Sequence, residues 1–542
     1  MDSIKLKVKG AKTAVYQESI FFLSGFMIIK KEVITSSGGL VELLEHKKIN
    51  QLDLLNSELK GEFLLIIQEE SKYTIVTDIV RSKPAFIAKT DEGFVITDDL
   101  QNVANKRIDE EKVSIFIESD CLFGSNNCYK HIYTCQAGEV VTIGNGEIQS
   151  ERYFEFIPEP NSKKMEIDQF VSTFNLLMEE IIERMVESAP EVNNWLIPLS
   201  GGHDSRIMVN SLKKAGIENV ICFSYGTSGN LQSKISKQIA DAVGYDWHFI
   251  ESTEHKWGQL QENGMIDEYV DYSFQGISTP HLQDFLAVYE LKKRNIISDN
   301  DIFLPGHTPV TGSGYTSKTE NFQTREQALD HIQKRFLNST FKSKEEAYFY
   351  LDNILGLSRI DKKHLCAYIN WQERRAKFII NSCRVYEFFG CDFRLPFWDL
   401  SLVKFWLSVA PEDRINRNLY KRSDREGILL DYLAKIPFES ELNSESGLTD
   451  FKQYLKTYIP IFLTVFLLRL SGRKQKTAEG MNLIYAQKGK TVGEIIAPIE
   501  DFPRDTHSLI KPYIKRYPYQ INAHLLSNLF ALRRAYDLQK SI

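Results

Sequence analysis

Long apolar segments are missing from this chain of 542 residues. The longest apolar run, near residues 459–468, is too short to span a bilayer and favours a core helix. The first five residues, Met-Asp-Ser-Ile-Lys, contain no apolar signal region. We therefore expect no membrane contact and a cytoplasmic location.

Cysteine is also scarce, with seven residues, an odd number, and no Cys-x-x-Cys pair. This usage suits free thiols in a reducing compartment. Cys121, Cys128 and Cys135 recur every seven residues, but that period fits neither a zinc ribbon nor a zinc finger. We expect buried thiols at these three positions and no metal.

A strong excess of charge of one sign is absent as well, since the formal net charge is -6. Apolar residues make up 43% and charged residues 25%, as in ordinary globular proteins. Nothing in this balance indicates a nucleic-acid partner. The length exceeds that of one ordinary core and predicts two or three domains.

Short β-strands separated by Gly, Asp and Lys turns are predicted for the first 155 residues. Asn145-Gly146 favours a tight hairpin turn, and the polar stretch 158–164 is typical of a linker. From Ile167 to Met185 the apolar residues take helical spacing. We therefore predict one domain over residues 1–158 and a second over 165–542, mainly helical beyond about residue 310. The strands are expected at 21–29, 61–68, 73–78, 85–89, 94–97, 140–143 and 148–154.

Residues 196–205 carry the strongest local signal, Leu-Ile-Pro-Leu-Ser-Gly-Gly-His-Asp-Ser. An apolar strand leads into the loop, a helix is predicted over 206–215, and a second strand begins at Val220. Gly201 and Gly202 let the backbone approach an anion closely. The helix that follows directs free N–H groups and its positive dipole end at the same point. The pattern predicts a phosphate site.

Side chains of the same loop extend this interpretation. Ser200 and Ser205 add hydroxyl donors, and Leu199 leads into them. Asp204 is a poor anion ligand by itself, so it is best explained as a Mg2+ ligand that bridges to phosphate. The Walker phosphate loop is excluded because no Gly-Lys-Ser/Thr follows the glycines. A simple glycine turn between strand and helix is the alternative.

The loop resembles the Ser-Gly-Gly-x-Asp-Ser loop of the ATP pyrophosphatase group. That resemblance implies ATP and Mg2+ as cofactors. It also implies a reaction in which a carboxylate or amide oxygen attacks the α-phosphate, AMP is transferred and pyrophosphate leaves.

Most of the chain is similar to the asparagine synthetase family. The similar segments are Leu-Lys-Gly-Glu-Phe-Leu-Leu-Ile-Ile at 59–67, Asp-Ile-Val-Arg-Ser-Lys-Pro at 78–84, Val-Ile-Thr-Asp-Asp at 95–99 and Arg-Leu-Pro-Phe-Trp-Asp at 394–399. The family resemblance implies a mixed α/β and α+β fold. An Ntn-type β-sandwich, glutaminase-like domain would precede a parallel-sheet domain of the adenine-nucleotide α-hydrolase-like kind with a helical C-terminal part. Members found with bacterial surface-polysaccharide genes are the most similar.

This family resemblance implies further site residues. Ser224, Tyr225 and Gly226 would contact adenosine, and Gly306 with His307 would form a second glycine loop near the phosphates. Asp392 stands where the family usually has Glu, and it would act with Arg394 as a catalytic pair that positions or deprotonates the amine. Each of these sites has a structural alternative. Residues 224–226 could be a plain strand end, residues 306–307 a glycine turn, and Asp392 a helix-terminal carboxylate. A family lysine is left unassigned among Lys435, Lys452 and Lys456.

Three departures from the family pattern limit the interpretation. Position 2 is Asp2 and no cysteine precedes Cys121, so the nucleophile for glutamine hydrolysis is missing. We expect the first domain to be a structural partner, as in β-lactam synthetase and lasso-peptide cyclases. Val310 stands where an acidic metal ligand is expected, with Thr308 or Thr311 as substitutes, and Gln232 replaces a Glu.

These observations predict an ATP-dependent amide-forming ligase of the asparagine synthetase type. Its small-molecule substrates would be a carboxylate (aspartate or a sugar or uronic acid) and ammonia or another amine. An intramolecular cyclase and a catalytically impaired ATP-binding pseudoenzyme are the alternatives. A homodimer and a separate glutaminase partner are both left open.

Overall fold

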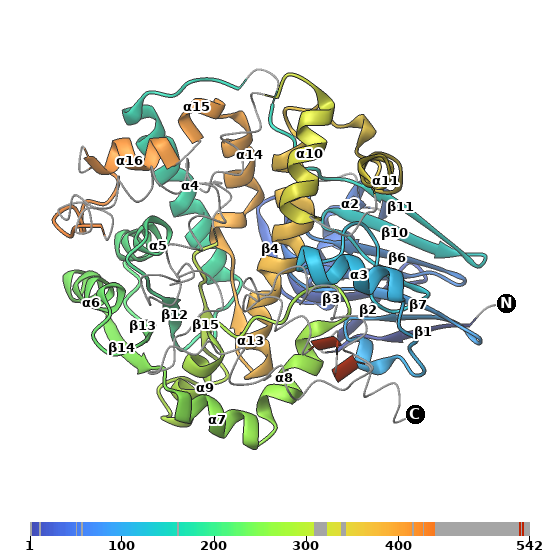
Figure 1. The fold of residues 1–542 in the computed structure, drawn as a ribbon, viewed down its shortest axis with the longest axis horizontal. Helices are drawn as coiled ribbons and strands as arrows, with labels where there is room; N and C mark the ends of the chain where they lie inside the picture. The colour runs from blue at the N-terminus through green and yellow to red at the C-terminus, as the bar shows by residue number, and fades with distance from the viewer. Residues whose placement is uncertain are drawn as a thin grey trace, which may run out of the picture.

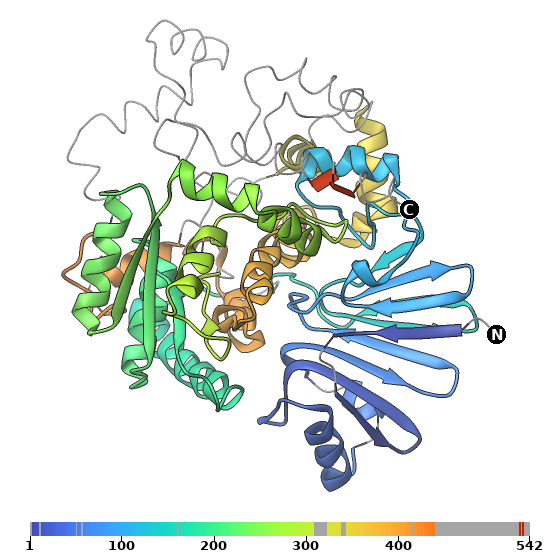
Figure 2. The same cartoon turned by 90° about the horizontal axis from the view of Figure 1, so that it is seen from below.

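The computed structural model describes residues 3–9, 12–49, 51–55, 58–159, 162–307, 322–337, 343–414, 417–425, 428–438, 531–532 and 534–535. Two mostly antiparallel sheets occupy one side of the molecule, and a parallel sheet with its helices occupies the other (Figures 1 and 2). This is the mixed α/β arrangement expected from the sequence. Among the described residues, no helix is both long and apolar enough to cross a membrane.

The first region folds as two sheets that share a core. One has the order β1-β8-β7-β9 and the other β11-β10-β6-β5-β3-β2, with β4 paired to β3. Leu64 and Ile66 on β5 face Ile87 and Ile96 of the smaller sheet in one buried cluster. The strands are β1 (Ser3–Lys7), β2 (Lys12–Tyr16), β3 (Ser19–Ile29), β4 (Glu32–Ile34), β5 (Lys60–Gln68), β6 (Lys72–Thr77), β7 (Phe86–Thr90), β8 (Gly93–Thr97), β9 (Ile132–Thr134), β10 (Glu139–Gly144) and β11 (Glu147–Arg152).

Strand β5 is apolar on both faces because both faces are covered. Its alternate residues Phe63, Leu65 and Ile67 pack on the other side with Leu40 and Leu44. Those two leucines lie on α1 (Ser37–Lys47), which Ser36 caps by accepting a hydrogen bond from the Gly39 N–H at 3.1 Å. A continuous apolar run is therefore expected here instead of simple alternation.

Every strand predicted for the first region overlaps an observed one. The predicted hairpin joins β10 to β11, and Asn145 (φ 52°) and Gly146 (φ 78°) both have positive φ, as a type I′ turn requires. Prediction missed the strands β1, β2, β4 and β9 and the helices α1, α2 (Gln51–Leu55) and α3 (Glu110–Ser119). The missed strands are short or lie at sheet edges, where apolar alternation is weak.

The second region begins with α4 (Ile167–Glu187), as its helical spacing predicted. It then forms a parallel sheet of order β14-β13-β12-β15-β16. Its strands are β12 (Trp195–Pro198), β13 (Val220–Gly226), β14 (Asp246–Glu251), β15 (Ile302–Phe303) and β16 (Asp392–Phe393). The chain runs outward from β12 to β14 and then returns to the other side of β12. Such a reversal marks the place where open parallel sheets bind ligands, at the carboxyl ends of the strands.

Helices surround this sheet, and among the described residues beyond about residue 310 they predominate, as predicted. They are α5 (His203–Lys214), α6 (Leu231–Val243), α7 (Glu254–Glu262), α8 (Met265–Phe274), α9 (Phe285–Lys293), α10 (Arg325–Phe336), α11 (Lys344–Phe349), α12 (Leu365–Ile369), the π-helix η4 (Asn370–Ile379), α13 (Arg384–Phe388), α14 (Leu400–Ser408), α15 (Pro411–Arg414) and α16 (Asn418–Arg425). The predicted core helix at 459–468 lies outside the described residues.

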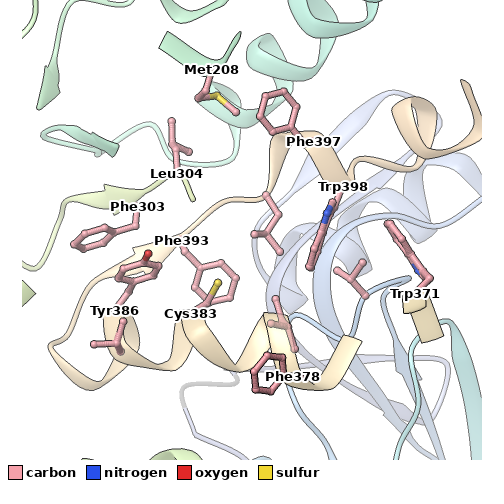
Figure 3. Packing of buried hydrophobic residues seen from close by; sticks show 14 of the residues in the cluster. Met208, Phe303, Leu304, Trp371, Phe378, Cys383, Tyr386, Phe393, Phe397 and Trp398 are labelled. Atoms are coloured by element: carbon pink, nitrogen blue, oxygen red, sulfur yellow. The ribbon is translucent and has the colours of Figure 1, made fainter. Parts of the chain in front are cut away.

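The two regions share buried surface. One apolar cluster contains Val80 and Phe116 from the first region together with Trp195 and Trp371 from the second. Figure 3 shows part of this cluster, with Trp398 beside Trp371 and Phe303 beside Tyr386. The domain limits 1–158 and 165–542 remain predictions, but this packing makes the junction a continuous core.

Candidate functional site

The glycine-containing loop at the end of β12 is closed by its two serines. The Ser200 N–H donates to Ser205 Oγ at 3.2 Å, and that hydroxyl lies 3.0 Å from the Ser200 carbonyl, to which it donates. Ser200 Oγ in turn accepts from the Gly202 N–H at 3.2 Å. The loop is thus held by its own hydrogen bonds. Both hydroxyls predicted to face phosphate already serve this closure.

Helix α5 starts at His203, three residues before the predicted start. Its N-cap is Gly202, which offers no side-chain acceptor to the first turn. The N–H groups at a helix start need an external partner when the cap gives none, and the helix dipole favours an anion there. A Cβ on Gly201 would lie 3.3 Å from Ile235 of α6, so glycine allows the loop to pack tightly.

The second predicted loop meets the first. Gly306 follows β15 and packs on the start of α5, where an added Cβ would lie 3.4 Å from the Ser205 nitrogen and 3.6 Å from Asp204 Cβ. The neighbouring His307 places Nε2 3.1 Å from Ser382 Oγ, and burial, with the charge of Arg375, lowers its pKa to about 3. His307 is therefore a neutral imidazole. Val310, Thr308 and Thr311 lie outside the described residues.

Asp204 is the acidic residue in the first turn of α5, among these backbone donors. Its Oδ2 accepts a hydrogen bond from Arg417 Nη2 at 2.9 Å, and its Oδ1 is buried with no hydrogen-bond partner in the described part of the chain. Burial raises the pKa of Asp204, while the charges of Arg417 and His203 oppose that rise. An unpaired hard oxygen beside an anion site fits Mg2+, which in proteins commonly takes one or two carboxylates together with phosphate oxygens.

The predicted adenosine-side residues end β13, next to the loop strand. Tyr225 donates its hydroxyl to Asp284 Oδ1 at 2.5 Å, and Tyr386 donates to Asp284 Oδ2 at 2.5 Å. The Tyr386 ring stacks on Phe303 with centroids 4.0 Å apart (Figure 3). Tyr225 is therefore fixed in position. Ser224 is buried and Gly226 has φ +132°, a conformation that favours glycine.

Asp392 and Arg394 lie next to each other, and Asp392 lies well before the loop along the sheet. Register pairs Asp392 with Ile302 and Ile302 with Trp195, four residues before Leu199. At about 3.3 Å per residue, Asp392 lies roughly 13 Å from Leu199 along the strand direction. The catalytic role assigned to this pair stays a prediction.

Both residues belong to an ion cluster between the two regions. Asp392 accepts from Arg394 Nη1 at 2.6 Å and from Lys83 Nζ at 3.1 Å, and Lys83 also reaches Glu387 at 2.8 Å. Burial opposes the charge of Asp392, but Lys83 and Arg394 hold its pKa well below the usual range. Arg394 also donates to Ser188 Oγ at 2.9 Å. Asp392 is a firmly ionised partner of two cations in this structure.

Sequence reasoning missed the segments that cover the loop from the C-terminal side. Arg206 is fully buried on α5 and donates to the carbonyls of Ile436 at 2.7 Å and Pro437 at 2.6 Å. Its guanidinium lies 4.0 Å from the centre of the Phe438 ring, which stacks on His203 at 4.2 Å. An arginine in the first turn after a phosphate loop was the one available signal. No local pattern marks Arg417.

The three regularly spaced cysteines are buried free thiols. Burial raises the pKa of each of Cys121, Cys128 and Cys135. Within the described ranges, no group of three or more His, Cys, Asp or Glu side chains is arranged to hold a metal ion.

No protein-family model matches this chain, and no curated protein matches it. Similarity to solved structures is weak. An allosteric regulatory enzyme of purine biosynthesis is 12% identical, with a TM-score of 0.19 over 44% of this chain and 61% of its own. The chain thus spans less than two thirds of that enzyme.

Two further structures cover more of their own length. The NH3-dependent NAD synthetase from Campylobacter jejuni is 12% identical, with a TM-score of 0.21 over 40% of this chain and 97% of its own. The NMN synthetase from Francisella tularensis is 11% identical, with a TM-score of 0.19 over 48% and 96%. These scores are too low to decide fold or function.

Proposed function

We propose that this chain is an ATP-dependent amide-forming ligase of the asparagine synthetase type. The observation that carries the proposal is the closed loop 199–205, which ends at an uncapped helix start beside the unpaired oxygen of Asp204. It lies at the point of the parallel sheet where strand order reverses, next to the glycine loop after β15. Each part suits a metal-bound polyphosphate.

The proposed chemistry uses these groups in the following way. The N–H groups at the uncapped start of α5 would hold the β- and γ-phosphates and stabilise the charge that builds on departing pyrophosphate. Mg2+, when bound at Asp204, would supply charge neutralisation on the same phosphates. Tyr225, fixed by Asp284, would border the adenosine. The carboxylate substrate, aspartate or a sugar acid, would become an acyl-adenylate that an amine attacks.

The amine would be ammonia or a larger amine instead of the amide of glutamine. The cysteines of the first region, Cys121, Cys128 and Cys135, are buried thiols, which does not suit the exposed nucleophile that glutamine hydrolysis needs. The first region would then stabilise the second through their shared core. An intramolecular cyclase would use the same loop and differ only in where the amine resides.

Titration calorimetry of ATP with Mg2+ on the full chain tests the proposal. We expect wild-type protein to bind ATP only with Mg2+, and Asp204→Ala to lose that binding. Asp241→Ala is the matched control, because Asp241 is an exposed carboxylate on α6 paired only to Lys237 among the contacts described. Pyrophosphate release would then be screened with different acids and amines.

The impaired pseudoenzyme has one structural observation in its favour. Arg417 already occupies one oxygen of Asp204, the carboxylate expected to bind the metal. If this pair were permanent, the loop would not accept Mg2+. Binding of ATP that leads to no pyrophosphate release with any acid and amine tested would support the pseudoenzyme over the ligase. Absence of ATP binding, with intact wild-type protein, would contradict both.

A further inference from the structure

The ion pair between Arg417 and Asp204 leaves polar atoms unsatisfied on both sides. Asp204 Oδ1 and Arg417 Nε are each buried without a hydrogen-bond partner among the described residues. One is an acceptor that suits a cation, and the other is a donor that suits an anion. A buried polar atom without a hydrogen-bond partner is unfavourable in the folded protein. One ligand that carries a cation and an oxyanion together would give each of these two atoms a partner.

Arg417 is also held in an unusual backbone conformation. Its φ is +59°, in the left-handed region that arginine rarely adopts. Strained backbone of this kind persists only where the surroundings enforce it, and it gathers at ligand sites. The backbone of Arg417 therefore holds the base of its side chain in a fixed position.

The surroundings of Arg417 explain how that position is kept. Tyr420 on α16 packs against Phe170 and Phe174 of α4, with ring centroids 5.9 and 5.7 Å apart. Before Arg417, Asp413 accepts a hydrogen bond from the Met165 N–H at 2.9 Å and pairs with Arg422 at 3.3 Å. The guanidinium thus approaches α5 from a rigid frame, and it is still about one third exposed at 33%.

We propose that Arg417 is a phosphate-binding residue of the nucleotide site. In the nucleotide-free protein it holds Asp204. When a metal-bound polyphosphate enters, Asp204 passes to the divalent cation and Arg417 passes to phosphate oxygens. The guanidinium fork is suited to this exchange because it can bind phosphate through two parallel N–H groups. The inference rests on the proposed function, since it names a further residue of the same site.

The test is calorimetric binding of inorganic pyrophosphate with Mg2+, and of Mg2+ alone, to the full chain. We expect Arg417→Ala to weaken Mg2+-pyrophosphate binding at least tenfold. Mg2+ alone should bind as well as to wild type or more tightly, because a competitor for Asp204 is gone. Lys421→Ala is the matched control, since Lys421 is an exposed cation on α16, the helix that begins directly after Arg417, and it should change neither value.

Two outcomes would overturn the inference. Unchanged pyrophosphate affinity in Arg417→Ala would show that the residue never reaches phosphate. Tighter binding of both Mg2+ and Mg2+-pyrophosphate would show that Arg417 only blocks the site. Arg417→Gln, which keeps a polar side chain but removes the charge and the guanidinium fork, repeats the measurement if the alanine variant unfolds. Failure of wild-type protein to bind Mg2+-ATP would instead refute the proposed function itself.

Discussion

A short hydrogen bond between Glu62 on β5 and Leu395 after β16 is one of the links between the two regions. The Leu395 N–H donates to Glu62 Oε1 at 2.6 Å, while Glu62 Oε2 is buried with no partner in the described part of the chain. Both residues border a cavity of about 30 Å3 that Arg184 and Trp398 also line. That volume admits about two water molecules. Burial raises the pKa of Glu62 to about 8 against the opposing charge of Arg394.

The raised pKa of Glu62 predicts a loss of stability as pH rises. In the unfolded chain Glu62 ionises near pH 4.5, whereas in the folded protein it stays protonated to about pH 8. Between these values the unfolded state releases a proton that the folded state keeps, so the free energy of unfolding falls with increasing pH. Glu62→Gln removes this contribution to the pH dependence of the free energy of unfolding. Urea unfolding at pH 5 and pH 8 should show wild type losing about 1–3 kcal/mol relative to Glu62→Gln.

The control for this measurement is Glu92→Gln. Glu92 is exposed on a turn of the first region and pairs with Lys5. It should follow the wild-type pH dependence. If wild type and Glu62→Gln kept a constant difference from pH 5 to 8, Glu62 would be ionised throughout and the raised pKa would be wrong.

The lowered pKa of His307 predicts the opposite pH dependence, a loss of stability as pH falls. Its pKa is lowered to about 3 by burial and by Arg375, so the folded protein resists protonating an imidazole that the unfolded chain protonates near pH 6.5. Stability from this group is present above pH 6.5 and is lost as pH falls toward 3. Thermal unfolding between pH 7 and 5 should therefore show a smaller loss for His307→Gln than for wild type. An equal loss in both proteins would contradict the assignment of a neutral buried imidazole.

Lys377 and Glu373 form a buried pair, one turn apart on η4, with only 1% and 4% of their side chains exposed. Lys377 also donates to the carbonyls of Leu122 at 2.9 Å and Gly124 at 2.6 Å in the first region. Lys377→Met leaves an uncompensated buried carboxylate and should cost about 3–5 kcal/mol in the free energy of unfolding. The double variant Lys377→Met/Glu373→Leu should recover part of that loss. A double variant no more stable than Lys377→Met would show that the carbonyl contacts dominate.

Two substitutions at Tyr225 distinguish a structural role of its hydroxyl from a binding role of its ring. Tyr225→Phe removes the hydroxyl bonded to Asp284 and should cost about 1–3 kcal/mol of stability, since the acceptor is buried and would lose a partner. The ring remains, so Mg2+-ATP affinity should stay within about threefold of wild type. Tyr225→Leu should lower that affinity as well, if the ring borders adenosine. Calorimetric titration of both variants decides, and equal affinities would place adenosine elsewhere.

Local sequence patterns predicted the elements whose signals are short-range. The apolar run before Ser200, the two glycines and the helix that follows gave the strand, loop and helix at the observed place. Asn145-Gly146 likewise determined a hairpin turn, because both residues tolerate positive φ. The start of α5 was placed three residues late, since no capping side chain marks it. Two-residue strands such as β15 and β16 exist only through their neighbours in the sheet.

What the sequence by itself determined is the succession of strand, glycine-containing loop and helix around residues 195–214, because an apolar run, glycines and a helical pattern act through neighbours along the chain. Only the tertiary structure decided what surrounds that loop. Arg417 meets Asp204 across 213 positions, and Leu395 meets Glu62 across 333. Such pairs form when distant segments pack into one core, and their geometry depends on every element between them. No local pattern of residues encodes that distance.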